Sequence, residues 1–278
     1  MLAVQANLKT TLKIFSAKES AFVSLFKKLV LPAVTVLCAA ALALSFSGCG
    51  RVACGIDSSV SGLPKRFAKD EEKIVVFAEG RTDGFWASDG WHNGQMFNCT
   101  WSRNNAVIEG GVMNMSVTKG ADGAYYGAEY RSSSYFGYGF YAVSMKAADC
   151  SGVISSMFTY TNSPVWDEID IEILGKNMTQ VQFNYYTNGE GGHEYLYNLG
   201  FDASEDFHEY AFDWQKDSIT WYVDGTPIYR ATENIPSHPQ QIMANVWNCI
   251  GHDEWSGKFD ESSLPATAQY EWIAYSAA

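Results

Sequence analysis

The chain has 278 residues, enough for one large β domain or for two smaller domains. Its formal net charge of −12 argues against nucleic acid as a partner, because the phosphates would be repelled. Residues 1–49 hold five lysines and one glutamate, so residues 50–278 carry a net charge of −16. A uniformly acidic body suits a neutral polymer better than a polyanion, and aromatic residues, at 15% of the chain, are suited to stacking on sugar rings.

Residues 1–49 have the layout of an export signal. The segment from Leu29 to Gly48 has no charged residue, Lys27-Lys28 precedes it, and small residues lead to Cys49. The sequence Phe46-Ser47-Gly48-Cys49 resembles a bacterial lipoprotein box, in which Cys49 would carry the lipid. An uncleaved membrane anchor is the alternative, because ~20 apolar residues can span a bilayer. We therefore expect an exported protein, either secreted or anchored at the membrane surface as a lipoprotein.

Residues 50–72 combine a stretch rich in Ser and Gly with a charged run, which predicts a flexible tether ahead of a folded domain over residues 73–278. Export would permit disulfides in this domain. An odd number of cysteines allows at most one bridge inside it and leaves one thiol over. The cysteines are Cys54 in the tether and Cys99, Cys150 and Cys249 in the domain.

From about Lys73 onward, short segments of alternating apolar and polar residues are separated by Gly, Asn and Asp turns. The triplet Val223-Asp224-Gly225 is typical of a tight hairpin. No apolar pattern of helical period and helical length follows residue 72. Many short strands over ~200 residues predict a single antiparallel β-sandwich.

Several of these strands have one apolar face and one face of acids, amides and aromatic side chains, because successive residues of a strand point to opposite sides. The polar and aromatic faces hold Glu129 and Arg131; Ser156, Phe158 and Tyr160; Gln182, Asn184 and Tyr186; and Met243, Asn245 and Trp247. A solvated outer face is the alternative, but such faces favour Lys, Glu and Thr. We therefore predict a sugar-binding cleft laid across one sheet.

The segment Asp167–Gly175 has the most informative pattern in the chain. Alternation places Glu168, Asp170 and Glu172 on one face of a strand and three isoleucines on the other. Carboxylates in a row repel one another, so the alternative to a catalytic role is a purely structural ladder of acids. Paired carboxylates that flank a sugar bond are the catalytic groups of most glycosidases. Because residues i and i+4 on a flat strand are roughly 13 Å apart, the two glutamates must lean together over a concave sheet.

The stretch Trp166–Glu172 resembles the active-site strand of glycoside hydrolase family 16, and Gly175–Glu194 resembles the bacterial lichenases, which are 1,3-1,4-β-glucan endohydrolases. Further matches are Met96–Trp101, Tyr210–Gln215 and Ile242–Asn248. The resemblance covers roughly residues 77–275 and implies an all-β jelly-roll sandwich with the cleft on its concave sheet. It also implies an endo-glycosidase that cuts β-1,4 bonds of mixed-linkage glucans such as lichenan and cereal β-glucan by a retaining double displacement.

By this resemblance Glu168 is the nucleophile, Glu172 is the general acid and then the general base, and Asp170 assists them. Three close carboxylates cannot all ionise easily, so we expect Glu172 to keep its proton near neutral pH while Glu168 stays charged. The resemblance implies no cofactor for catalysis. The family's sugar contacts fall on Asn93, Glu129, Arg131, Phe158, Trp166, Asn184, Tyr186, Asn245 and Trp247.

The chain departs from the lichenase pattern at its cysteines and at a metal site. Relatives commonly bridge the cysteine that matches Cys99 to one at the position of Gly127, and that bridge cannot form here. We therefore hypothesise a replacement bridge between Cys150 and Cys249. The branch commonly holds a structural calcium, and the resemblance implies one near Glu271, which stands where a ligand Asp is usual.

The nearest alternative is a hydrolase or transglycosylase of the same family that acts on xyloglucan or laminarin. Laminarinases usually carry an extra residue within the acidic motif, which this chain lacks, and xyloglucan enzymes lack the segment from Val181 to Glu194. A non-catalytic glucan-binding module on the same fold is a second alternative, although such modules typically lose one of the acids. We expect a monomer that binds β-glucan, does not bind nucleic acid, and attaches to a membrane only through a lipidated Cys49.

Overall fold

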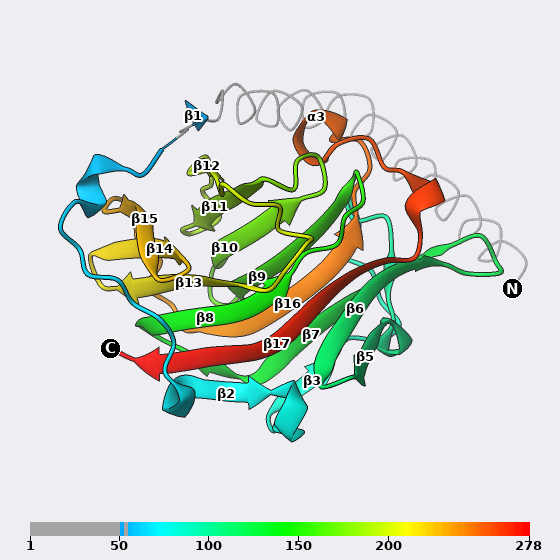
Figure 1. The fold of residues 1–278 in the computed structure, drawn as a ribbon, viewed down its shortest axis with the longest axis horizontal. Helices are drawn as coiled ribbons and strands as arrows, with labels where there is room; N and C mark the ends of the chain where they lie inside the picture. Colours follow the sequence, from blue (N-terminus) through cyan, green and yellow to red (C-terminus); the bar gives the residue numbers. More distant parts are fainter. Residues whose placement is uncertain (1–50, 53–54) are drawn as a thin grey trace, which may run out of the picture. The chain divides into compact units, whose positions relative to one another are not determined.

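The computed structural model describes residues 51–52 and 55–278, so the predicted export signal, Cys49 and Cys54 lie outside the described residues. Within the described ranges, no helix is long and apolar enough to cross a membrane. The chain folds into two antiparallel sheets that pack face to face (Figure 1). The all-β sandwich predicted from the alternating pattern is thereby confirmed.

One sheet carries the predicted cleft face and is called the cleft sheet. Its strands, in spatial order, are β1 (Arg51–Val52), β12 (Tyr195–Asn198), β11 (Gln180–Tyr186), β10 (Asp167–Leu174), β9 (Val153–Thr161), β16 (Gln240–Asn248), β7 (Tyr125–Phe136) and β3 (Phe85–Ala87). Only the β1–β12 pair among these is parallel. The strand with the acidic motif, β10, therefore lies well inside the sheet, with neighbours on both sides.

The second sheet is called the outer sheet. It holds β15 (Thr226–Ala231), β14 (Ser218–Val223), β13 (His208–Gln215), β8 (Gly139–Lys146), β17 (Ala266–Ala277), β6 (Val112–Lys119) and β5 (Ala106–Glu109), with β2 (Lys73–Val76) also on β17. Short elements complete the fold: β4 (Thr100–Trp101), α3 (Asp253–Ser256), and the 3-10 turns η1 (Ser58–Val60), η2 (Asp70–Glu72), η3 (Phe77–Glu79), η4 (Arg103–Asn105) and η5 (Glu261–Ser263). Pairing of β6 with β7 joins the two sheets, as the nearly closed wrap of a jelly roll requires.

The core fills the space between the sheets and follows the predicted alternation. On β11 the residues that belong to the core are Val181, Phe183 and Tyr185, all at 2% exposure or less. From the outer sheet, Trp221 stacks on Phe183 with ring centroids 5.8 Å apart. Full burial of one such side chain stabilises the fold by roughly 1.5–3 kcal/mol. The apolar contacts therefore fix which face of each cleft-sheet strand is left for polar residues.

The predicted hairpin is also confirmed. Val223 of β14 pairs with Thr226 of β15, and the two residues between them, Asp224 and Gly225, have φ angles of +45° and +69°. Asp and Gly tolerate this left-handed backbone better than most residues, because Asp can hydrogen-bond locally and Gly has no Cβ. The turn reverses the chain in two residues, and a bulge at Trp221 and Tyr222 then shifts the register of β14 on β15.

Residues 57–72 are part of the folded domain, so the predicted tether is wrong for this stretch. The backbone N–H of Arg66 donates to the carbonyl of Gly225 at 2.9 Å, and that of Ala68 donates to Glu209 Oε1 at 2.9 Å. The Arg66 guanidinium also lies over the Phe140 ring, 3.9 Å from its centroid. These contacts tie the segment to the outer sheet through partners far away in the sequence.

We expect Glu209→Gln to stabilise the protein more at pH 8 than at pH 5. Burial raises the pKa of Glu209 from 4.5 to about 7, while the Ala68 N–H opposes the shift. Between these values the folded state holds a proton that the unfolded state has lost, so stability falls as pH rises through 7. A glutamine keeps the acceptor for Ala68 and removes the titration, with a gain of about 1–2 kcal/mol at pH 8 after allowing for solvent screening. Thermal unfolding at both pH values measures it, and an equal effect at both would contradict it.

The predicted Cys150–Cys249 disulfide is wrong, because both thiols, like that of Cys99, are free and buried. Cys150 belongs to the core between the sheets, and its thiol donates to the carbonyl of Asp260 at 3.4 Å. Cys249 belongs to a separate apolar cluster with Cys99 and Trp247. The two sulfurs therefore serve different clusters. A Cβ at Gly127, the position of the usual partner of Cys99, would lie 2.6 Å from Cys99 Sγ and 2.8 Å from the Val246 carbonyl oxygen, so any side chain there would require its neighbours to shift.

We expect Cys99, Cys150 and Cys249 all to be alkylated by iodoacetamide in denaturant without reductant, and all to resist it in native buffer. Burial raises the pKa of Cys99 to about 12 and that of Cys150 to about 11, so reactive thiolate is scarce in the folded protein. Peptide mass spectrometry of the non-reduced chain measures the labelling. A cross-linked Cys150–Cys249 peptide would contradict this state.

Candidate active site

The three acids lie together on β10, as the alternation predicts. Their strand pairs with β9 on one side and β11 on the other. Ile169, Ile171 and Ile173 fill the core at 1% exposure or less, so the acids must point to the opposite face. Asp170 is 4% exposed, and the two flanking glutamates are half-buried. The cleft sheet therefore presents a short row of poorly hydrated carboxyl groups.

Burial and mutual repulsion raise the pKa of all three acids. Burial raises the pKa of Glu172 to about 8, and the charge of Glu168 adds to the shift. Burial raises the pKa of Glu168 to about 7, opposed by hydrogen bonds from Trp166 and Asp170. The pKa of Asp170 lies well above its usual range, through burial and the charges of the two glutamates beside it. A site of this kind holds protons near neutral pH, as an acid catalyst must.

Trp166 provides the direct partner of Glu168. Its indole Nε1–H donates to Glu168 Oε2 at 2.6 Å, and its ring stacks on Tyr186 with centroids 4.6 Å apart and planes at 16°. Tyr186 pairs directly with Glu168 across β10 and β11. Stacking thus holds the indole where its N–H meets the carboxylate. Trp166 is also 42% exposed, which leaves surface for a sugar ring.

Glu172 has a different partner, which the motif comparison missed. Gln182 lies opposite Glu172 in the register of β10 and β11, and its Nε2 donates to Glu172 Oε2 at 2.8 Å. Alternation put Gln182 on the cleft face, but only the cross-strand register reveals the bond. Trp255 on α3 then donates to Gln182 Oε1 at 3.1 Å. Nothing in the local sequence pattern could have linked α3 to this site.

Asp167, at the first position of β10, anchors the strand. It is fully buried and accepts hydrogen bonds from the backbone N–H groups of Asn188, Ser237 and His238, and from the His238 ring. Burial opposes its ionisation, but these donors prevail and lower the pKa of Asp167. Sequence reasoning gave this residue no role. It fixes the end of the strand from which Glu168 projects.

The predicted sugar contacts next to the acids lie on neighbouring strands. Phe158 on β9 and Asn184 on β11 flank Asp170 on its two sides. Asn184 is 3% exposed and its Oδ1 has no partner within the described residues. Asn245 on β16 accepts a hydrogen bond from Ser156 Oγ at 2.6 Å. These side chains are nearly fully buried and lie on the strands that flank β10 or come next to it in the cleft sheet.

Glu129 and Arg131 extend the same face onto β7. Arg131 Nη1 contacts Glu129 Oε1 at 3.4 Å, and its Nη2 donates to Gln241 Oε1 at 2.6 Å. Ser88 Oγ also donates to Glu129 Oε1, at 2.5 Å, while burial raises the pKa of Glu129. The guanidinium is thus held between two acceptors, with its charge facing the cleft. Neither Ser88 nor Gln241 stood out in the sequence.

Asn93 and Trp247 lie at a third part of the site. Asn93 is exposed, and its Oδ1 accepts a hydrogen bond from Trp101 Nε1 at 2.9 Å. Trp247 is on the expected face of β16 but is only 3% exposed, because Phe97 stacks on it at 3.9 Å between centroids. Phe97 rather than Trp247 therefore presents the aromatic surface there. All nine predicted contacts lie on β7, β9, β11, β16 or the loops leading into the cleft sheet.

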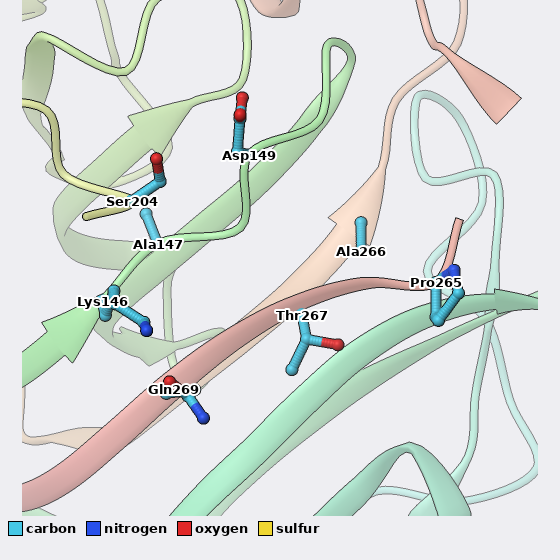
Figure 2. Close-up of a pocket in the computed structure, with 8 residues that line it drawn as sticks. All are labelled: Lys146, Ala147, Asp149, Ser204, Pro265, Ala266, Thr267 and Gln269. Carbon is cyan, nitrogen blue, oxygen red and sulfur yellow. The ribbon is translucent and has the colours of Figure 1, made fainter. Parts of the chain in front are cut away.

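The hollow in Figure 2 is not this site. It has a volume of about 480 Å³ and none of the predicted site residues among its lining. Its lining consists of Lys146, Ala147, Asp149, Ser204, Pro265, Ala266, Thr267 and Gln269. Asp149 is the one acid in this lining, so the hollow lacks the pair of carboxyl groups that hydrolysis of a sugar bond requires.

Glu271 lies in no cluster of acidic side chains among the described residues, and the calcium expected near it stays a prediction. Glu271 Oε2 accepts a hydrogen bond from Ser144 Oγ at 2.6 Å. Within residues 55–278, no group of three or more His, Cys, Asp or Glu side chains is arranged to hold a metal ion. Calcium prefers six to eight oxygen ligands, with carboxylates prominent among them. No step described below involves a metal.

A jelly-roll sandwich with a row of acids on one strand of an aromatic and polar sheet defines the class of β-sandwich glycoside hydrolases. The family model "Glycosyl hydrolases family 16" matches residues 93–273. The chain belongs to glycosyl hydrolase family 16. It is 54% identical to a β-glucanase of Paenibacillus polymyxa over 192 residues, covering 68% of this chain and 80% of the relative. It is 49% identical to a xylanase/β-glucanase of Ruminococcus flavefaciens over 213 residues, which are 73% of this chain but only 26% of that protein.

Solved structures agree with the sequence comparison. A lichenase derived from a mouse hindgut metagenome is 52% identical, with a TM-score of 0.68 over 70% of this chain and 93% of that one. A β-glucanase of Bacillus licheniformis is 46% identical, with a TM-score of 0.71 over 76% of this chain and all of that one. A laminarinase catalytic domain of Thermotoga maritima shares the fold. It is 22% identical, with a TM-score of 0.58 over 69% of this chain and 97% of that one. The predicted resemblance to the lichenase branch is confirmed.

Proposed function

We propose that the protein is an exported endo-1,3-1,4-β-glucanase that hydrolyses β-1,4 bonds of mixed-linkage β-glucan with retention of anomeric configuration. The observation that carries the proposal is the row of Glu168, Asp170 and Glu172 on one face of β10, with the two glutamates partly exposed among the predicted sugar contacts. Close relatives named β-glucanase and lichenase support the choice of substrate. Catalysis requires no cofactor in this family's chemistry.

In the first half of the reaction, the Glu168 carboxylate forms a bond to the anomeric carbon of the sugar. The bond from that carbon to the leaving oxygen breaks, and Glu172 gives its proton to this oxygen. In the second half, Glu172 takes a proton from water, and the water oxygen bonds to the same carbon. Glu168 then leaves as a carboxylate. Each half inverts the carbon once, so the product keeps the original configuration.

The environments of the two glutamates support this assignment. Glu168 receives the indole N–H of Trp166 and a hydrogen bond from Asp170, and both favour its charged form. Burial and the charge of Glu168 raise the pKa of Glu172, so ionisation of Glu168 favours a proton on Glu172. Asp170, protonated by its surroundings, acts as a donor to the nucleophile.

Two parts of the proposal concern residues outside the described ranges. Export through residues 1–49 is supported by the uncharged run that Lys27-Lys28 precedes. Attachment through a lipid on Cys49 is supported by the lipoprotein-like sequence that ends there. The protein acts as a monomer on a polysaccharide that lies along the cleft sheet.

The wild-type chain should release reducing ends from lichenan. In Glu168→Gln and in Glu172→Gln, kcat should fall by about 10²–10⁴-fold, because each substitution removes a group that changes its bonding in the reaction. Assays on lichenan, laminarin, xyloglucan and carboxymethyl-cellulose measure the substrate preference, and proton NMR of the first product measures its anomeric form. Glu109→Gln, an exposed glutamate on β5, is the matched control.

Release from laminarin or xyloglucan in place of lichenan would assign a different glucan of the family as the substrate, with the proposed mechanism unchanged. Binding to lichenan with no release from any glucan would identify a non-catalytic module. An α-anomer as the first product would contradict the double displacement.

We expect kcat/KM to rise with pH as Glu168 loses its proton and to fall as Glu172 loses its own, near their pKa values of about 7 and about 8. Trp166→Phe removes the N–H donated to Glu168, so it should move the rising limb to higher pH and leave the falling limb in place. Trp272→Phe, on the outer sheet, is the matched control. A rising limb that stays fixed or moves to lower pH in Trp166→Phe would refute this role.

A further inference from the structure

Gln182 is the direct hydrogen-bond partner of the side chain that we assign as acid and base. It lies on β11 opposite Glu172, at 4% exposure, and its Nε2 is 2.8 Å from Glu172 Oε2. Its Oε1 is 3.1 Å from the indole Nε1 of Trp255 on α3. Both ends of one buried amide are therefore engaged, one by the reacting acid and one by a residue from a separate element.

Trp255 determines which end of the amide faces the acid. An indole N–H can only donate a hydrogen bond, so the atom that it meets must be the amide oxygen. The amide nitrogen is then left to face Glu172, where it can only donate. Rotation of the amide by half a turn would set two donors against each other at Trp255 and lose that bond. The indole also packs near Trp247, with centroids 6.1 Å apart, which restrains its ring.

The direction of this bond has two consequences for Glu172. A donated N–H stabilises the carboxylate and so restrains the rise in pKa that burial causes. It also occupies Oε2, which leaves Oε1 as the oxygen that holds the proton. A general acid must hold its proton at a defined place and release it easily, and this bond supports both needs.

We propose that Gln182 is a positioning residue for Glu172, and that Trp255 acts through Gln182 by fixing the direction in which its amide donates. The inference rests on the acid and base role proposed above for Glu172. The alternative is that Gln182 and Trp255 merely satisfy each other's polar groups, in which case Glu172 would titrate normally without them.

Other titratable groups also face Glu172 and must stay constant in a test. These groups are Glu168 and Asp170 on β10, Tyr186 on β11, Glu194 beyond it, and Cys249 after β16. Changes at Gln182 and Trp255 leave all of them in place. A shift in the titration of Glu172 in such variants therefore reports the lost hydrogen bond.

The test uses the full chain with Gln182→Met and Trp255→Phe. Methionine keeps the length of glutamine without its donor, and phenylalanine keeps a ring without the N–H. Each variant should move the falling limb of kcat/KM, and the titration of the Glu172 carboxyl by carbon-13 NMR, upward by about one pH unit. The resonance is assigned by its loss in Glu172→Gln. Any loss of sugar stacking at Trp255 should raise KM and leave the pH of the falling limb of kcat/KM unchanged.

Matched controls lie on the same strand and in the same residue class. Gln180→Met changes a glutamine on the same face of β11 whose amide bonds Asn198. Trp272→Phe changes a tryptophan on the outer sheet. Both should leave the titration of Glu172 unchanged. Thermal unfolding shows whether Gln182→Met or Trp255→Phe has lost its fold. If one of them has, the titration of Glu172 is measured in the other.

The double variant separates action through Gln182 from an independent effect. If Trp255 acts only through Gln182, adding Trp255→Phe to Gln182→Met should give no further shift. Additive shifts would overturn the role of Trp255, and an unchanged Glu172 titration in Gln182→Met would overturn the inference as a whole. Failure of the proposed function would instead appear as wild-type protein that releases no sugar. The NMR titration still decides the inference in that case.

Discussion

The site depends on the burial of one face of β10. Ile169, Ile171 and Ile173 are at most 1% exposed, and each contributes roughly 1.5–3 kcal/mol by its burial. A slip of the strand by one residue would expose all three together, so the register is strongly fixed. The same alternation forces the acids onto one face, where burial and repulsion oppose their ionisation. Burial of the three isoleucines therefore offsets the free-energy cost of holding three carboxyl groups close together.

Among the residues that the structure describes, neutral donors and not cations complete this cluster. Trp166 donates to Glu168 and Gln182 donates to Glu172, while the charges that act on the acids are their own and that of Glu194. A lysine or arginine at this distance would favour the ionised form of every acid. No proton would then remain for the leaving oxygen near neutral pH. Neutral N–H groups orient carboxyl groups with a smaller effect on their charge.

The fold and the acid row could be predicted because both follow from alternation along single strands, and the roles of Glu168 and Glu172 followed from a resemblance. Other features could not. Residues 57–72 dock through contacts such as that of Arg66 N with Gly225 O, which leave no periodic pattern. The thiols of Cys150 and Cys249 serve different clusters, which spacing cannot reveal.

The two glutamates that we propose as catalytic are chemically identical, so their difference must come from their neighbours. Glu168 takes its donor from Trp166, two residues earlier in the chain, and stacking on Tyr186 of β11 holds that indole in place. Glu172 takes its donor from Gln182 on another strand, which is in turn oriented by Trp255 on α3. A change in α3 can therefore alter the proposed acid and base, Glu172, without touching the donor of the proposed nucleophile, Glu168. Tertiary structure thus distinguishes the two glutamates at both ends of the acid row, through Tyr186 behind Trp166 and through Trp255 behind Gln182.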